Sequence, residues 1–180
     1  MQFKESLAIG RVCESKVACW LRFNRGWSVL PVYEIAEGQF KGPQFFTPEA
    51  EIVAPDMLAM KGATVRWIEA KQKSVFSWHR ITGRWVTGID LKLYDKYLQI
   101  ALCSPFPVWL MFYHTLAVTS EGDGKCPTGL YGNDIVRLSE TENHRHENWG
   151  RGGMVYWAKD SLIALATCEE VEEAYRKRAA

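Results

Sequence analysis

Two short segments of the sequence carry charged side chains at a spacing that could bring them together. Asp56 lies in the first segment, residues 51–60, and Glu69 and Lys71 lie in the second, residues 64–71. Both segments are predicted to be strands. If Gly62–Ala63 form a two-residue hairpin turn, with glycine in the first central position as a type II′ turn prefers, Asp56 faces Glu69 across the strands. Lys71 then lies on the same face as Glu69, because side chains alternate along a strand.

Such a group of side chains is suited to binding a metal ion. Facing residues on paired strands have Cβ atoms about 4.5–5.5 Å apart, so two facing carboxylates repel each other unless a positive charge lies between them. Mg²⁺ and Mn²⁺ take oxygen ligands of this kind. A lysine beside them could position a water molecule or neutralise charge on a phosphate. The spacing therefore predicts a metal site made of two carboxylates and one lysine.

The alternative is that the three charges share a solvated strand face by chance. Against this, the face that carries Asp56 is otherwise apolar, with Ile52, Ala54, Leu58 and Met60. A carboxylate on a largely apolar face requires a partner, because burying an isolated charge is costly. We therefore favour the functional interpretation.

Pro55–Asp56, followed after twelve residues by Glu69–Ala70–Lys71, resembles the PD-(D/E)XK motif of the restriction-endonuclease-like nuclease superfamily. The resemblance implies an α/β fold with an αβββαβ core, in which helices flank a central mixed sheet. It also implies hydrolysis of DNA that depends on Mg²⁺, with Mn²⁺ as a substitute. In this family Asp56 and Glu69 would bind the metal, Ala70 would contribute its carbonyl oxygen, and Lys71 would serve the attacking water.

Members similar to Holliday junction resolvases and to Mrr also place a glutamate on the first helix, a few residues after a glycine. Gly10 and Glu14 resemble that arrangement, which makes Glu14 the candidate third carboxylate and metal ligand. Glu34, near the end of the first predicted strand, is an alternative, and Glu5 is a further one. Because two active sites would be needed to cut both strands of DNA, the chain is also a candidate for a homodimer.

The predicted elements follow the order of such a core. Hydrophobic periodicity predicts a helix over residues 3–23, ended by Asn24–Arg25–Gly26, and a second helix that starts from an N-cap at Asp90. The second helix ends near residue 103. Strands are predicted at 27–35, 51–60, 64–71 and 108–116, with a loop at 36–48 and with Pro31 typical of an edge strand or of a bulge. Residues 1–118 are thus expected to form the nuclease-like core.

Residues 119–180 are expected to be a C-terminal elaboration of the same domain. The sequence predicts a glycine-rich loop at 122–132, strands at 131–138 and 154–158, a polar loop at 139–153 and a last helix capped by Asp160. His144 and His146 are interpreted as part of the polar loop, because no second Cys or His pair lies at metal-binding spacing.

Positive charge is concentrated around the motif. The net charge of the chain is +1, but residues 61–96 hold eight Lys and Arg against three Asp and Glu, a net charge of +5 that leaves −4 elsewhere. A phosphate-binding face would require such a concentration. Aromatic side chains alternate with arginines there, as in proteins that stack bases and hold phosphates. The predicted DNA-binding residues are Lys73, Trp78, Arg80 and Arg84.

The alternative for this segment is structural. In that interpretation Trp78 and Trp85 pack a hairpin around Thr82–Gly83, and Arg80 and Arg84 belong to a solvated face.

Several other protein classes lack support. The five cysteines are odd in number and form no CxxC pair, which argues against a disulfide framework and for a reducing compartment. The most apolar run, 108–113, is six residues long, whereas a bilayer span needs about 20. The N-terminus lacks a signal-peptide pattern, and there is no P-loop or GxGxxG motif. A cytoplasmic protein without membrane segments or a nucleotide cofactor is expected.

The sequence therefore predicts a Mg²⁺-dependent DNA nuclease that hydrolyses phosphodiester bonds, in the endonucleolytic mode. An alternative from another class is a catalytically inactive module of the same fold that binds DNA or a protein partner through the Trp and Arg segment. The acidic and lysine positions argue against it, because a silent module has no need to keep carboxylates on an apolar face.

Overall fold

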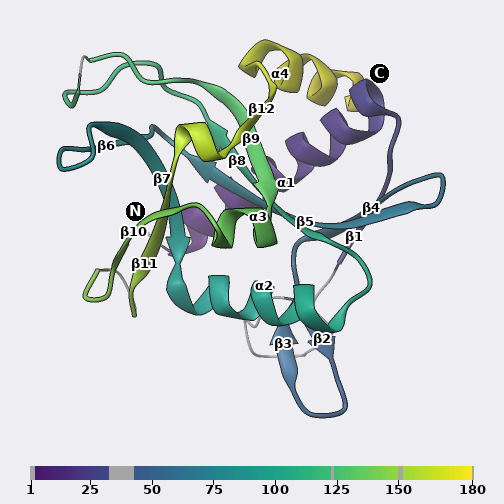
Figure 1. Cartoon of the computed structure of the whole chain (residues 1–180). Coiled ribbons are helices and arrows are strands. Elements are labelled where there is room, and N and C mark those ends of the chain that lie inside the picture. Colours follow the sequence, from purple (N-terminus) through teal and green to yellow (C-terminus); the bar gives the residue numbers. More distant parts are fainter. Residues whose placement is uncertain (1–2, 33–42, 123, 150–151, 180) are drawn as a thin grey trace.

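The computed structural model describes residues 3–32, 43–122, 124–149 and 152–179 (Figure 1). The largest sheet has six strands in the order β1-β4-β5-β8-β9-β12. Their bounds are Ser28–Pro31 (β1), Met57–Lys61 (β4), Thr64–Lys73 (β5), Val108–His114 (β8), Gly129–Asp134 (β9) and Ile163–Ala166 (β12). β5 and β8 are parallel, and the other neighbours in this sheet are antiparallel. The sheet is therefore mixed.

Two smaller sheets complete the strands. Four strands form a sheet in the order β10-β11-β7-β6, with bounds Glu142–His146 (β10), Met154–Ala158 (β11), Arg84–Asp90 (β7) and Ser77–His79 (β6). A short antiparallel pair consists of β2 (Gln44–Phe46) and β3 (Glu51–Val53).

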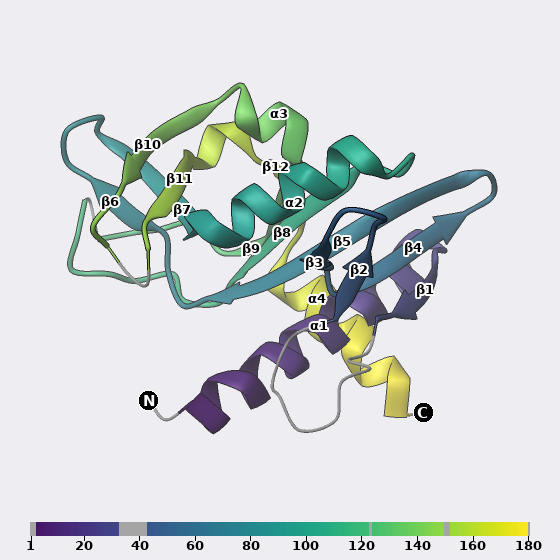
Figure 2. The same cartoon turned by 90° about the horizontal axis from the view of Figure 1, so that it is seen from below.

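Helices cover both faces of the central sheet (Figure 2). α1 (Phe3–Arg25) and α4 (Cys168–Arg176) pack on one face of the sheet. The opposite face is covered by α2 (Leu91–Cys103), α3 (Ile135–Ser139) and the four-stranded sheet. Two single turns of 3₁₀-helix, η1 (Lys159–Ser161) and η2 (Lys177–Ala179), precede β12 and follow α4. Among the described residues, no helix is long and apolar enough to cross a bilayer.

The order α1, β1, β4, β5, α2, β8 is the αβββαβ order predicted from the sequence, and the prediction of an α/β fold with a central mixed sheet is confirmed. Residues 119–180 supply β9 and β12 to the central sheet, β10 and β11 to the four-stranded sheet, and α4 to the face of α1.

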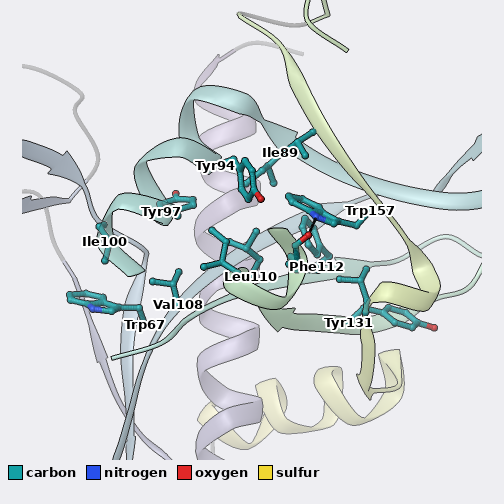
Figure 3. Close-up of a cluster of buried hydrophobic side chains, with 14 of the residues drawn as sticks. Trp67, Ile89, Tyr94, Tyr97, Ile100, Val108, Leu110, Phe112, Tyr131 and Trp157 are labelled. Atoms are coloured by element: carbon teal, nitrogen blue, oxygen red, sulfur yellow. Dashed lines mark hydrogen bonds between the residues drawn. The ribbon is translucent and has the colours of Figure 1, made fainter. Parts of the chain in front are cut away.

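Two apolar cores hold these layers together. Figure 3 shows the larger one, where Tyr94, Tyr97 and Ile100 of α2 meet Leu110 and Phe112 of β8. Its largest side chain, Trp157, is fully buried and its indole Nε1–H donates to the Leu138 carbonyl at 2.9 Å. The second core lies between the other sheet face and α1 with α4. Because both faces are covered, β5 and β8 are buried on two sides, as parallel strands usually are.

The predicted strand boundaries are corrected in the first half of the chain. β1 is an edge strand, as Pro31 indicates, but it ends at Pro31, and the rest of the predicted strand falls mostly outside the described residues. β2 lies in the predicted loop 36–48. The predicted strand 51–60 is two strands, β3 and β4, because the chain bends at Ala54–Pro55–Asp56. There the Ala54 N–H donates to the Pro43 carbonyl at 2.7 Å, and proline has no N–H to offer the ladder.

Larger corrections fall in the second half. The predicted strand 131–138 ends at Asp134, whose side chain accepts a hydrogen bond from the Val136 N–H at 2.8 Å and so begins α3. The predicted polar loop 139–153 contains β10. Asp160 lies in η1 and does not cap the last helix. Thr167 does, in a capping box with Glu170.

Candidate active site

The hairpin of β4 and β5 has the predicted register. Lys61 pairs with Thr64 and Leu58 pairs with Trp67. Gly62 begins the turn at φ +57°, and among the described residues only glycines have a positive φ. This pattern, positive φ only at the first central residue, is that of a type II′ turn. The last pair of the ladder is Met57 with Ile68. Asp56 therefore lies one step beyond the ladder, at the level of Glu69.

Asp56 is held by the backbone of the neighbouring strands. Its Oδ2 accepts a hydrogen bond from the Ala70 N–H at 2.8 Å, and its carbonyl accepts one from the Val32 N–H at 2.9 Å. The carboxylate thus lies against β5, on the segment that carries Glu69 and Lys71. The amide of Ala70 orients the Asp56 side chain, whereas the sequence predicted a role for the Ala70 carbonyl.

Glu69 is a buried carboxylate in the middle of the sheet. Its side chain is 1% exposed, and among the described residues its carboxylate contacts the Lys71 ammonium and the Tyr97 hydroxyl. Its one close cationic partner is the ammonium group of Lys71, two residues further along the same strand face. The Lys71 side chain is 32% exposed. A buried carboxylate is therefore joined to the surface through a single lysine.

The electrostatics of the site show more negative than positive charge. Burial raises the pKa of Asp56 to about 8, and the charge of Glu69 adds to this, while Lys71 and the Ala70 N–H oppose it. Burial and the charge of Glu69 also raise the pKa of Glu14. Burial lowers the pKa of Lys71, but the charges of Glu69 and Asp56 outweigh it and hold the pKa above its ordinary value. Lys71 is thus a firmly protonated cation among acidic groups.

Glu14 approaches this group from α1, across the sheet from α2. It is half-buried, and its Oε1 lies 3.9 Å from the position a Cβ would take on Gly10. Glu34, the alternative third carboxylate, lies outside the described residues, and for Glu5 only the helical backbone is described. The structure thus brings Asp56, Glu69 and Lys71 together and adds the field of Glu14. We call these four residues the acidic cluster.

The residues of the acidic cluster fit a divalent cation in their chemistry. The two oxygens of Glu69 are buried close to Asp56, and carboxylate oxygens are the ligands that Mg²⁺ and Mn²⁺ prefer. In the described part of the chain no three His, Cys, Asp or Glu side chains already converge on one point. The Lys71 ammonium lies against Glu69 and neutralises the negative charge that a bound metal ion would neutralise.

Two residues at this site were not predicted from the sequence. Tyr97 of α2 is 2% exposed, and burial followed by the charges of Glu69 and Asp56 raises its pKa well above the ordinary value. Its helical spacing with Tyr94 and Ile100 marks the buried face of α2 but gives no sign of the contact with Glu69. Cys13 is buried on α1, and burial with the charges of Asp56 and Glu14 raises its pKa to about 12.

Lys73, a predicted DNA-binding residue, lies next to the acidic cluster. It ends β5, opposite His114 of β8, and burial and the charge of Lys71 lower its pKa. His114 is fully buried, stacks on Phe76 at 3.6 Å between ring centroids, and has no hydrogen bond to either ring nitrogen among the described residues.

The other predicted DNA-binding residues lie elsewhere. Trp78, Arg80 and Arg84 belong to the β6–β7 hairpin, which projects from the end of the molecule opposite the β4–β5 hairpin (Figures 1 and 2). Among the described residues no hydrogen bond, ion pair or ring contact joins this hairpin to Glu69 or Lys71. The two hairpins lie at opposite ends because β5 itself runs from one to the other.

Within the β6–β7 hairpin the tryptophans pack on each other, as the structural alternative has it. Trp78 and Trp85 are cross-strand partners with ring centroids 5.0 Å apart, and Gly122 lies against both rings. Arg84 borders a hollow of about 120 Å³ beside them. Trp67 is also structural, since it is buried and its Nε1–H donates to the Ser104 hydroxyl at 3.0 Å.

The basic segment 61–96 is therefore not one face. Lys61 and Arg66 lie on the β4–β5 hairpin, Lys71 and Lys73 at the acidic cluster, and Arg80 with Arg84 at the opposite hairpin. These basic side chains are distributed along the length of the central sheet, because a ten-residue strand places its two ends far apart. DNA binding by Lys73, Trp78, Arg80 and Arg84 stays a prediction.

Solved structures that superimpose on this chain include two nucleases. No protein-family model matches the sequence, and no curated protein matches it significantly. The Holliday junction resolvase Hjc of Archaeoglobus fulgidus superimposes with a TM-score of 0.48 at 10% identity, covering 84% of this chain and 90% of the resolvase. D212, a nuclease from a fusselovirus, superimposes with a TM-score of 0.36 at 12% identity, covering 96% and 90%.

Proposed function

We propose that this chain is a nuclease that hydrolyses phosphodiester bonds in DNA with the help of a divalent metal ion. The observation that carries the proposal is the grouping of Glu69, a fully buried carboxylate, with Asp56 and with Lys71, its one cationic partner among the described residues. Two buried carboxylates beside each other favour a site that holds a cation, because carboxylate oxygens are the ligands that hard divalent ions prefer.

Asp56 and Glu69 would hold the ion, and Glu14 would join them from α1. When bound, the ion would supply Lewis-acid stabilisation of the charge on a phosphate group. The Ala70 N–H fixes the orientation of Asp56. Asp56 keeps a proton at neutral pH in the metal-free protein, because its pKa is raised to about 8. That proton has to leave before Asp56 can act as a ligand.

Lys71 would orient the attacking water and neutralise charge on the scissile phosphate. Because its pKa lies above the ordinary value, it stays protonated at neutral pH and acts as a hydrogen-bond donor rather than as a base. Its partial exposure lets the ammonium turn from Glu69 toward a substrate. Lys73, two residues beyond Lys71 on the same face of β5, would contact the phosphate backbone.

The test is cleavage of supercoiled plasmid and of branched DNA with Mg²⁺, with Mn²⁺ and with a chelator. Wild-type protein should nick DNA only with a metal, and Lys71→Ala should be slower by about 100-fold or more. Arg137→Ala, which removes an exposed cation on α3, should cut like wild type. Equal cleavage rates for Lys71→Ala and wild type would contradict the proposal. DNA binding without cleavage under any metal would instead support the inactive-module alternative.

A further inference from the structure

A cavity of about 250 Å³ opens beside the C-terminal end of α1, on the face of the central sheet that α1 covers. Aliphatic side chains of β4, β5, β8 and β12 form most of its wall. Three indoles, those of Trp20, Trp27 and Trp109, and two guanidinium groups, those of Arg25 and Arg66, complete it. Its size is just below the range of about 300–1,000 Å³ typical of ligand pockets, so it suits a small flat group.

The guanidinium groups lie over the indole rings. The Arg66 carbon Cζ is 4.6 Å from the centroid of the Trp109 ring and 5.1 Å from that of Trp27. Arg25 lies 5.7 Å from the centroid of the Trp20 ring. Cations and aromatic faces are therefore presented together, as in sites that combine stacking with phosphate binding.

The positive charge around the cavity is not compensated by acidic groups. Within the described ranges, none of Arg22, Arg25, Lys61 and Arg66 forms an ion pair, and the Lys61 ammonium donates to the Arg25 carbonyl at 2.6 Å. Elsewhere Arg145 is paired with Glu142, whereas the exposed Arg80 and Arg84 form no ion pair among the described residues either, so the cavity differs from the rest of the surface in its indoles rather than in its unpaired cations. An anionic ligand would be attracted to this end of the sheet.

We propose that this cavity holds an unpaired nucleotide of a DNA strand, with its base against Trp27 and Trp109 and its phosphate near Arg25 and Lys61. Indoles stack on any base, and guanidinium groups bind phosphate oxygens in pairs. An apolar protein segment could also lie on the aliphatic wall, but it would leave the cations without partners. This inference rests on the proposed function, because it takes DNA as the substrate.

The cavity lies within reach of the acidic cluster. Arg66 and Glu69 are three residues apart on β5, which places them on opposite faces and about 10 Å apart along the strand. Along α1, Arg25 lies eleven residues beyond Glu14, about 16 Å of helix. Because Arg66 and Glu69 lie on opposite faces of β5, a single strand that occupies both sites has to pass around the β1 edge of the sheet. The nucleotide in the cavity would then belong to the same strand as the phosphate at the acidic cluster.

The experiment uses the eight tryptophan indole N–H signals in an NMR spectrum of the full chain, recorded with a chelator so that no DNA is cut. The probes are a short single-stranded oligothymidylate, a fully paired duplex of the same length, and deoxyadenosine monophosphate. We expect the single strand to shift the signals of Trp27 and Trp109 and the duplex to leave them unchanged. Deoxyadenosine monophosphate should shift the same two signals at higher concentration, which would identify base and phosphate as the recognised groups.

Matched variants make the test quantitative. Arg66→Gln should weaken binding of the single strand by about tenfold or more, and Arg66→Lys should restore only part of it, because lysine has no planar group to stack. Arg137→Gln and Trp149→Leu change an exposed cation and an exposed indole outside the cavity and should bind like wild type.

Several results would overturn the inference. One is equal affinity of Arg66→Gln and Arg137→Gln, and another is a shift confined to Trp78 and Trp85. A third is movement of the cavity signals with protein concentration alone, abolished by Ile163→Asp, which would assign the face to a second copy of the chain. Binding by Glu69→Gln at wild-type strength separates this inference from the nuclease proposal, because cleavage can fail while the cavity still binds.

Discussion

Lys71 places its ammonium group against the carboxylate of Glu69, and the two side chains differ in exposure, at 32% and 1%. A carboxylate this deeply buried requires a positive partner, and in the described structure Lys71 supplies it. Asp56 and Glu14 share this environment, and burial followed by the charge of Glu69 raises the pKa of each. The stability and the proposed chemistry of the site therefore depend on the same contact.

Removing the lysine should destabilise the metal-free protein. We expect Lys71→Ala to lower the free energy of unfolding by about 3 kcal/mol or more, because it leaves a buried charge without a partner. The double variant Glu69→Leu/Lys71→Met should recover most of the loss. Urea unfolding at neutral pH measures both. Arg137→Ala, which breaks an exposed pair, should cost less than about 1 kcal/mol, and an equally small effect of Lys71→Ala would contradict the account.

Metal binding should strengthen as pH rises toward 8.5. The pKa of Asp56 is raised to about 8, so the carboxyl is protonated at pH 6.5 and a metal ion has to displace that proton. The stabilisation of the protein by Ca²⁺, measured as a shift in Tm, should therefore be larger at pH 8.5 than at pH 6.5. Asp56→Asn should bind weakly at both pH values. A shift that falls with rising pH, or that persists in Asp56→Asn, would be inconsistent with Asp56 as a ligand.

His114 should make the protein sensitive to acid. Burial first, and then the charge of Lys73, lowers its pKa from 6.5 to about 3, so the folded state holds the neutral imidazole while the unfolded chain binds a proton below pH 6.5. Stability that is complete above pH 6.5 is then lost as pH falls toward 3, by up to about 1.4 kcal/mol per pH unit. In His114→Phe, which keeps a ring on Phe76, this part of the pH dependence should disappear. Unfolding free energies between pH 4 and 7 test it, and an unchanged slope would refute the prediction.

The β6–β7 hairpin should depend on Gly122. A Cβ there would lie 2.9 Å from the Trp85 ring and 3.0 Å from the Trp78 ring, and the residue has φ +61°. Gly122→Ala should therefore cost about 1–3 kcal/mol through overpacking, in addition to backbone strain. Gly62→Ala is the matched control, since Gly62 has φ +57° but no atom within 4 Å. If thermal unfolding shows equal losses for both variants, the packing of the two tryptophans on Gly122 is not what stabilises the hairpin.

The central hairpin and the placing of Asp56 beside Glu69 and Lys71 were predictable from the sequence because local rules determine them. Gly62 at the first turn position fixes the register, and the register in turn brings Asp56 to the level of Glu69. The αβββαβ order followed from helical and strand periodicity. The bend at Pro55 was missed because a strand pattern continues on both sides of it.

The second half was less predictable because its elements depend on tertiary packing. β10 contains His144, Arg145 and His146, whose polar side chains predict a loop. These residues form a strand because they pair with β11 and because the His144 ring stacks on Tyr156. The last helix begins at Cys168, after its N-cap Thr167, rather than near Asp160, because β12 lies between Asp160 and the helix. The concentration of basic residues in one stretch of the sequence did not predict where they lie in the fold, because β5 places its two ends far apart.

The central claim is that Glu69 belongs to a metal-dependent cleavage site, and the most direct measurement is the rate of plasmid nicking by Glu69→Gln in Mg²⁺ and in Mn²⁺. Glutamine preserves the size of the side chain and removes its charge. Glu140→Gln is the matched control at an exposed position outside the acidic cluster. The account predicts that Glu69→Gln, folded as wild type by circular dichroism, nicks DNA at least about 100-fold more slowly, while Glu140→Gln matches wild type. Equal nicking rates for Glu69→Gln and wild type would contradict it.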